Sequence, residues 1–124
     1  MLQISKGIFK KNDKYLLFQR SKEEVFPLLW DFIGGKQNPG ETSEETIIRE
    51  IREESDLIIN PGPLTEQKAY QDGIWDIVFS YYQPTIISGT ITLSAEHNKY
   101  DWFSKVQMKQ LDLHPAVKVY FNFK

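Results

Sequence analysis

The chain has 124 residues, of which 40% are hydrophobic and 14% aromatic, so residues 1–124 are expected to form one domain with an ordinary core. It contains no cysteine, which excludes disulfides, thiolate catalysis and cysteine-ligated zinc and fits a reducing, cytoplasmic location. The net charge is −2, no apolar run approaches ~18 residues, and no signal-like segment follows Met1, so neither a nucleic-acid polymer nor a membrane is an expected partner.

The first part of the chain predicts strands. Leu2–Lys11 and Lys14–Arg20 are β-rich and flank the turn pair Asn12-Asp13, so they are predicted to form a hairpin. Ser21–Leu29 contains a proline and is predicted to be a loop. Trp30–Ile33 is predicted to be a short buried strand.

A loop and a helix are predicted next. Gly34-Gly35 and Pro39-Gly40 bracket the loop, and the helix begins at Thr42. Thr42 and Glu45 have the spacing of a capping box, which satisfies backbone amides at a helix start. The apolar face of the helix consists of Ile47, Ile48 and Ile51. Pro61 cannot continue a helix, so the helix must end before it.

The second half of the chain predicts more strands and then short helices. The strand-like runs are Leu64–Gln71, Ile74–Pro84, Ile86–Leu93 and Tyr100–Phe103. Ser104 is placed to cap a short helix that reaches Leu111, and Pro115 is placed to start another. Strands around one strong helix predict an α/β sandwich with a mixed sheet.

The predicted helix carries a concentration of negative charge. Seven acidic residues and only two arginines lie between Glu41 and Asp56, which leaves a net positive charge on the rest of the chain. Glu50, Glu53 and Glu54 span an arc of about 100° on the helix. Like charges at these spacings destabilise a helix, and a bound magnesium ion would remove that penalty because it favours carboxylate ligands.

A solvated acidic face explains the same charges without a metal. Arg49 is spaced to pair with Glu45 and Glu53, and such pairs are common on exposed helices. The glycine pair Gly34-Gly35 before the helix favours a ligand site instead, because glycine lets the backbone approach a bound group closely. A glycine loop followed by grouped carboxylates is a narrower pattern than an acidic patch alone.

The segment Gly35–Leu57 resembles the Nudix box, whose pattern is Gly-x5-Glu-x7-Arg-Glu-U-x-Glu-Glu-x-Gly-U, where U is a bulky aliphatic residue. Every fixed position matches except Asp56, which stands where glycine is usual. Asp tolerates the left-handed conformation that such a glycine adopts. The preceding segment Leu29–Lys36 is also similar to the family, with Ile33 where proline is common.

The resemblance implies a Nudix-type α/β/α sandwich with one catalytic loop–helix. It implies a magnesium-dependent hydrolase, with Mn²⁺ as an alternative ion, that acts on a small nucleoside diphosphate-linked substrate. By the same resemblance the metal ligands would be Gly35 through its carbonyl, Glu50, Glu53, Glu54 and Glu96. Arg49, Glu50 and Glu53 form the implied catalytic set, in which Glu50 orients or deprotonates the water and Arg49 orients a glutamate. Glu41 would support the loop.

Outside the box, Arg20 and Lys36 are candidates to bind phosphate groups. The aromatic residues that could stack on a base are Phe32, Tyr70, Trp75 and Tyr81. His97 and His114 are predicted to be surface or capping residues.

The preferred substrate is a nucleoside triphosphate, oxidised or non-standard, cut to a monophosphate and pyrophosphate. A nucleotide sugar, a dinucleoside polyphosphate and a binding module without catalysis are alternatives. The chain could be a monomer or a homodimer.

Overall fold

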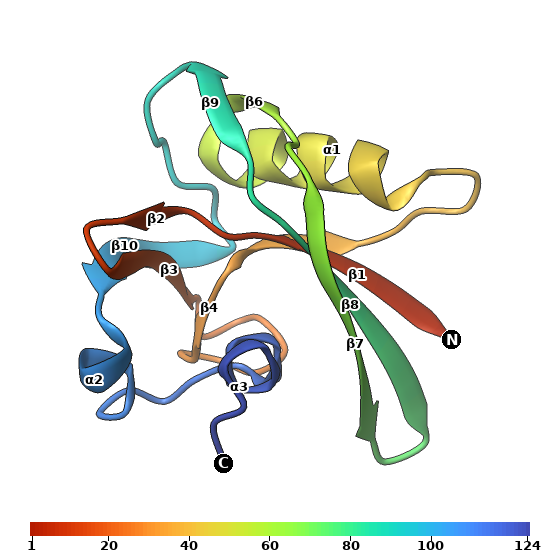
Figure 1. The fold of residues 1–124 in the computed structure, drawn as a ribbon, viewed down its shortest axis with the longest axis vertical. Helices are drawn as coiled ribbons and strands as arrows, with labels where there is room; N and C mark the ends of the chain where they lie inside the picture. The colour runs from red at the N-terminus through yellow and green to blue at the C-terminus, as the bar shows by residue number, and fades with distance from the viewer.

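In the computed structural model, which describes residues 1–124, the N-terminal strand lies inside a four-stranded sheet (Figure 1). The strand order is β5-β1-β8-β7, in which the strands are Ile33–Lys36, Leu2–Gly7, Trp75–Tyr82 and Leu64–Asp72. β1 is parallel to β8 and antiparallel to β5, while β7 and β8 form an antiparallel hairpin. The sheet is therefore mixed, as predicted.

In the second sheet, β3 (Lys14–Arg20) is the strand with which the others pair. These are β10 (His97–Phe103), β2 (Lys10–Lys11) and β4 (Trp30–Asp31). The predicted hairpin is therefore only partly right, because Lys10–Lys11 pairs with β3 while β1 belongs to the other sheet. The reason lies at Ile8 and Phe9, which are both buried but belong to two different hydrophobic clusters. The chain leaves one sheet and enters the other at this point.

The predicted helix is confirmed as α1 (Ser43–Ser55). Thr42 is its N-cap and forms the predicted capping box with Glu45. Asp56 is its C-cap in the left-handed conformation, with φ 63°, so this residue does adopt the backbone geometry that glycine favours. The end of the box thus keeps its shape despite the substitution.

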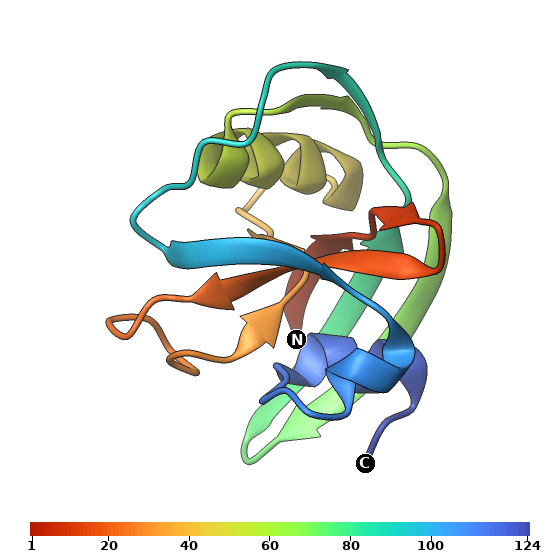
Figure 2. The same cartoon turned by 90° about the vertical axis from the view of Figure 1, so that its left-hand side faces the viewer.

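The two predicted late helices are present but short. α2 (Lys105–Met108) has the predicted N-cap Ser104 and ends before Leu111, and α3 (Pro115–Phe121) begins at the predicted proline. Figures 1 and 2 show α1 on one side of the strands and α2 and α3 on the opposite side. This arrangement is the predicted α/β/α sandwich.

Each side of the sandwich has its own core. On the α1 side the largest fully buried side chains are those of Phe18, Ile33, Ile47, Ile51 and Leu57. On the α3 side they are Leu17, Phe32, Phe79, Tyr81, Met108 and Val117. No helix combines the length and apolar character needed to cross a membrane.

Further predicted elements differ from the structure. The predicted strand Trp30–Ile33 is divided at Phe32 between β4 and β5, which belong to different sheets. Gly34-Gly35 is part of strand β5 and not a loop, because both residues pair with β1. The predicted strand Ile86–Leu93 is shortened to β9 (Thr85–Ser88), which pairs with β6 (Ile58–Asn60). After β9 the chain runs irregularly along the end of α1, where the Thr92 and Ser94 amides bond to carbonyls of the last helical turn.

Candidate active site

A cavity of about 560 Å³ lies beside the C-terminal part of β5 and the middle of α1. Its wall contains five residues that the sequence assigned to the site: Arg20, Gly35, Lys36, Glu50 and Glu96. Apolar residues from β1, β7 and β8 complete the wall. The cavity thus brings together segments that are far apart in the sequence.

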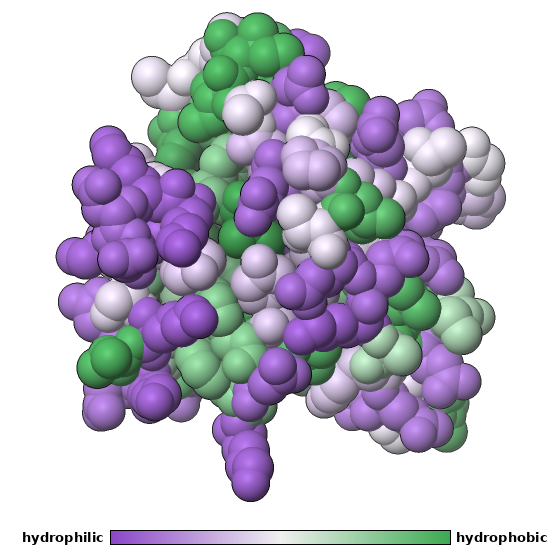
Figure 3. Space-filling view, viewed as in Figure 1, coloured by the Kyte–Doolittle hydropathy of each residue, from purple (hydrophilic) through white to green (hydrophobic).

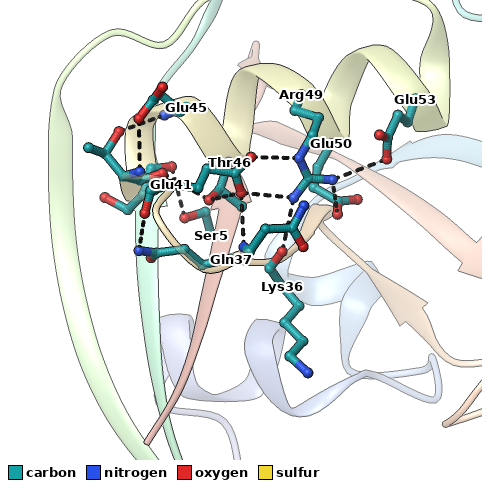
Figure 4. Close-up of polar contacts among 12 residues, drawn as sticks. Ser5, Lys36, Gln37, Glu41, Glu45, Thr46, Arg49, Glu50 and Glu53 are labelled. Atoms are coloured by element: carbon teal, nitrogen blue, oxygen red, sulfur yellow. Dashed lines mark hydrogen bonds and ion pairs between the residues drawn. The ribbon is translucent and has the colours of Figure 1, made fainter.

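Arg49 organises the acidic face of α1 (Figure 4). Its Nε and Nη2 donate to the two oxygens of Glu41 at 2.7 and 2.9 Å. Its Nη1 donates to Glu50 at 2.9 Å and to Glu53 at 3.2 Å, and Nη2 also donates to the Lys36 carbonyl at 3.1 Å. The predicted role of Arg49 in orienting a glutamate is thus compatible with its contacts, and they extend to three carboxylates.

The Glu41 carboxylate accepts several hydrogen bonds. Hydrogen bonds from Arg49, from the Asn38 amide and from the Thr46 hydroxyl lower the pKa of Glu41 to about 2. The Glu41 carboxylate is therefore ionised throughout the neutral range. It accepts from the Asn38 amide and from the Thr46 hydroxyl, so it joins the loop after β5 to α1.

Gly35 lies directly beneath the Glu50 carboxylate. A Cβ atom at this position would lie 2.5 Å from Glu50 Cδ, so only glycine leaves room for the carboxylate there. This contact places the Glu50 side chain next to the backbone of β5. Gly35 and Glu50, both of the Nudix-like segment, are thus packed directly against each other.

Glu54 is buried, with its side chain 3% exposed. Burial, followed by the adjacent Glu50 carboxylate, raises the pKa of Glu54 well above its usual value. Its Oε2 has no hydrogen-bond partner. Glu53, by contrast, has a side chain that is 59% exposed.

This donor set fits a hard divalent cation. No three His, Asp or Glu side chains stand ready-made around one metal position. The fit rests instead on the unpartnered oxygen of Glu54, on its neighbour Glu50, and on the close approach of the β5 backbone at Gly35. A cation would neutralise two carboxylates that lie side by side.

Glu96 reaches the cavity from the irregular segment before β10. Its carbonyl accepts a hydrogen bond from the Ser21 amide at 2.9 Å, which anchors it to the end of β3. Burial, followed by the acidic neighbours Glu24 and Glu50, raises the pKa of Glu96. The late acidic residue therefore faces the same cavity as Glu50.

Arg20 and Lys36 supply positive charge to the cavity. Arg20 is fixed by its Nε, which donates to the Val25 carbonyl at 2.7 Å, and its Nη1 lies 3.5 Å from Asp31. Lys36 is exposed at the end of β5. Both predicted phosphate-binding candidates thus line the cavity, together with Tyr70 and Trp75.

Sequence reasoning missed a buried ionic cluster below the cavity. Lys6 Nζ donates to Asp31 Oδ2 at 2.8 Å, and His114 Nδ1 lies 3.5 Å from Asp31 Oδ1. Burial alone would raise the pKa of Asp31, but His114, Lys6 and Arg20 outweigh burial and lower it. An aspartate inside the predicted buried strand Trp30–Ile33 was the signal that could have revealed this cluster.

Several predicted placements are corrected. Phe32 and Tyr81 are completely buried, so neither is free to stack on a base. Phe32 faces the α3 core and contacts the Tyr81 and Tyr120 rings edge-on. His97 is buried beside Glu54 and is not a surface residue. His114 caps α3 as expected, although it too is buried.

Comparison with known proteins shows the family to which the chain belongs. The NUDIX domain model matches residues 1–122. A nucleoside triphosphatase, NudI, from Enterobacter sp. (strain 638) is 30% identical, with 94% of this chain and 92% of the relative aligned. A CTP pyrophosphohydrolase from Escherichia coli (strain K12) is 28% identical, with 94% of this chain and 85% of the relative aligned.

Solved structures share the fold. A MutT NUDIX hydrolase from Burkholderia pseudomallei superimposes with a TM-score of 0.84 at 22% identity, covering 98% of this chain and 95% of that protein. A MutT protein from Methanosarcina mazei Go1 superimposes with a TM-score of 0.82 at 24% identity, covering 98% and 88%. Enzymes of this family generally use a divalent metal. The chain belongs to the NUDIX domain family and is a MutT-like Nudix hydrolase, an enzyme that cleaves a diphosphate linkage.

Proposed function

We propose that this protein is a magnesium-dependent pyrophosphohydrolase that converts a nucleoside triphosphate to its monophosphate and pyrophosphate. The observation that carries the proposal is the cavity wall, where Glu50 and Glu96 face the same space as Arg20 and Lys36. Acidic groups there can hold a cation, and basic groups can bind the phosphate oxygens that the cation leaves free. The names of the two curated relatives favour triphosphates over other diphosphate-linked substrates.

The proposed metal ligands are the carbonyl of Gly35 and the carboxylates of Glu50, Glu53, Glu54 and Glu96. A bound Mg²⁺, or Mn²⁺ in its place, would neutralise charge on the phosphate oxygens. Glu54 supplies a buried oxygen without a hydrogen-bond partner, which supports its assignment as a ligand. Glu53 is exposed and is held toward Glu50 through Arg49.

The chain's own residues divide the remaining tasks. Glu50 is the proposed group that orients the attacking water and accepts its proton, because Arg49 and Gly35 fix its carboxylate at the cavity wall. Arg20 and Lys36 are proposed to bind the phosphate chain. Trp75 is 60% exposed at the tip of the β7–β8 hairpin, where its ring can stack on the base.

A substrate panel tests this proposal. Purified protein with Mg²⁺ is given nucleoside triphosphates, oxidised triphosphates, nucleotide sugars and dinucleoside polyphosphates, and product release is measured. We expect pyrophosphate from triphosphates. A higher kcat/KM on nucleotide sugars or dinucleoside polyphosphates would replace the triphosphate assignment, and nucleotide binding without any product would support a binding module instead.

Matched variants test the metal site in the same assay. Glu53→Gln and Glu54→Gln are each expected to abolish activity while far-ultraviolet circular dichroism is unchanged. Glu44→Gln is the control, since Glu44 lies on the same helix, is exposed, and removes the same charge. Full activity in the Glu53 and Glu54 variants would mean that these glutamates do not bind the metal.

A further inference from the structure

Arg49 does not reach every glutamate of the proposed metal site. Its hydrogen bonds go to Glu41, Glu50, Glu53 and the Lys36 carbonyl, so its N–H groups are all engaged elsewhere. Lys6, the nearest buried cation, is committed to Asp31 at 2.8 Å. Glu54 is therefore a buried carboxylate that neither of these basic side chains orients.

One side chain with an N–H group does lie beside Glu54. His97 Nε2 is 3.7 Å from Glu54 Oε1, and both side chains are only 3% exposed. The other ring nitrogen of His97, Nδ1, is buried without a hydrogen-bond partner. Nε2 is therefore the ring nitrogen that has an acceptor beside it.

The fold holds the imidazole in this place. The His97 ring packs against the Phe18 ring with centroids 5.4 Å apart, and its backbone is opposite Arg20 in the pairing of β10 with β3. The register of β10 shifts between His97 and Lys99. Irregularities of this kind redirect side chains, and here His97 is buried while the next four residues of β10 are exposed.

We propose that His97 is a positioning residue for Glu54, whose carboxylate it orients by donating a hydrogen bond from Nε2 to Oε1. The distance of 3.7 Å closes to hydrogen-bond length with a small rotation of either side chain. Holding one oxygen in this way leaves Oε2 free to bind a cation. Groups that orient metal ligands typically change metal affinity by about 10- to 100-fold when they are removed.

The inference rests on the proposed function, because it takes Glu54 to be a metal ligand. His97 therefore does for Glu54 what Arg49 does for Glu50 and Glu53. The two positioning residues come from different elements, α1 and β10.

The wild-type protein allows a first test without any substitution. The chain has two histidines, so the ring nitrogens of both are readily assigned by ¹H–¹⁵N NMR of metal-free and Mg²⁺-loaded protein at neutral pH. We expect His97 as the neutral tautomer protonated at Nε2. A His97 ring protonated at Nδ1 would overturn the proposal, because Nε2 would then have no proton to donate to Glu54.

Direct Mn²⁺ binding provides the second test. The electron paramagnetic resonance signal of free Mn²⁺ is followed during titration of protein without nucleotide. His97→Phe fills the same space without a donor and is expected to weaken Mn²⁺ binding about 10-fold or more. His97→Gln places an amide N–H near the position of Nε2 and is expected to restore binding to within about 3-fold.

Controls separate positioning from packing. Phe18→Leu loosens the packing around His97 but keeps the Nε2–H donor, so it is expected to lower Tm with a smaller loss of Mn²⁺ affinity than His97→Phe. Equal losses of Mn²⁺ affinity in His97→Phe, His97→Gln and Phe18→Leu would overturn the proposal, because packing alone would then explain the losses. Unchanged affinity in His97→Phe would overturn it as well.

Glu54→Gln distinguishes a failure of the proposed metal site from a failure of the proposed role of His97. If Glu54→Gln binds Mn²⁺ as tightly as wild type, then the proposed metal site itself is wrong. If Glu54→Gln loses binding while His97→Phe keeps it, then only the role of His97 fails.

Discussion

The guanidinium of Arg49 and the carboxylate of Glu41 form a two-pronged pair, with Nε to Oε2 at 2.7 Å and Nη2 to Oε1 at 2.9 Å. Such paired hydrogen bonds fix the plane of the guanidinium as well as its position. With that plane fixed, the remaining N–H groups of Arg49 point to Glu50 and Glu53. Glu41 therefore acts on the site through Arg49, although it does not line the cavity.

Arg49→Lys is expected to lower kcat/KM by about 10- to 100-fold, because a lysine ammonium cannot form the two-pronged pair and also reach two more carboxylates. Steady-state kinetics and the Mg²⁺ concentration for half-maximal rate measure the effect. Arg52→Lys is the control, since Arg52 is exposed on the same helix. Unchanged kinetics in Arg49→Lys would show that charge alone is sufficient.

The adjacent glycines of β5 are expected to respond differently to alanine. At Gly35 the new Cβ would lie 2.5 Å from Glu50 Cδ, the end of a flexible side chain, so the fold survives while the carboxylate moves. We expect a loss of about 100-fold in kcat from such a displacement. At Gly34 the new Cβ would lie 2.0 Å from the Ser5 carbonyl oxygen, which is backbone, so Tm is expected to fall sharply. Equal thermal shifts in the two variants would contradict this distinction.

Asp56→Gly is expected to stabilise the protein. Asp56 has φ 63° at the C-terminus of α1, where a side chain is strained and a negative charge opposes the helix dipole. Glycine relieves both, for a net gain of about 0.5–1 kcal/mol in the free energy of unfolding measured with urea. Asp56→Asn removes the charge alone and should give part of this gain. A less stable glycine variant would mean that Asp56 has a favourable contact.

His114→Asn is expected to reduce the sensitivity of stability to acid. Burial lowers the pKa of His114 from 6.5 to about 4, so the folded state resists protonation and the unfolded state does not. Stability from this group is complete above pH 6.5 and is lost as pH falls toward 4. Between pH 7 and pH 5 the wild type should lose about 1–2 kcal/mol more than the variant. Asparagine can also cap α3, which keeps the comparison fair. Parallel pH profiles would contradict the expectation.

Local spacing made part of the site predictable. The capping box at Thr42 and the boundaries of α1 follow from residues within a few positions of one another. Arg49, Glu50 and Glu53 share one helix, so their proximity could be read from the helical period. The positions of these residues needed no knowledge of the rest of the fold.

Distant pairings were not predictable in the same way. β1 belongs to the four-stranded sheet because it pairs with β8, and the paired residues are more than 70 positions apart in the sequence. Phe32 lies between the short strands β4 and β5, and His97 lies at the irregular start of β10. Such short or irregular segments give too few residues to set a period that would predict which side chains are buried. Sequence alone therefore placed Phe32 at the substrate and His97 on the surface.

The position of β1 between β5 and β8 also sets an order of events during synthesis. β1 leaves the ribosome before every other element of this domain, yet its parallel neighbour is complete only when Tyr82 has been added. Pairing across such a separation must overcome the entropy of a long closed loop. The apolar residues of β1 and the edge of β1 that later pairs with β8 therefore stay exposed while about two thirds of the chain is made. Newly made chains at this stage expose apolar surface and an unpaired strand edge, which are features that favour aggregation.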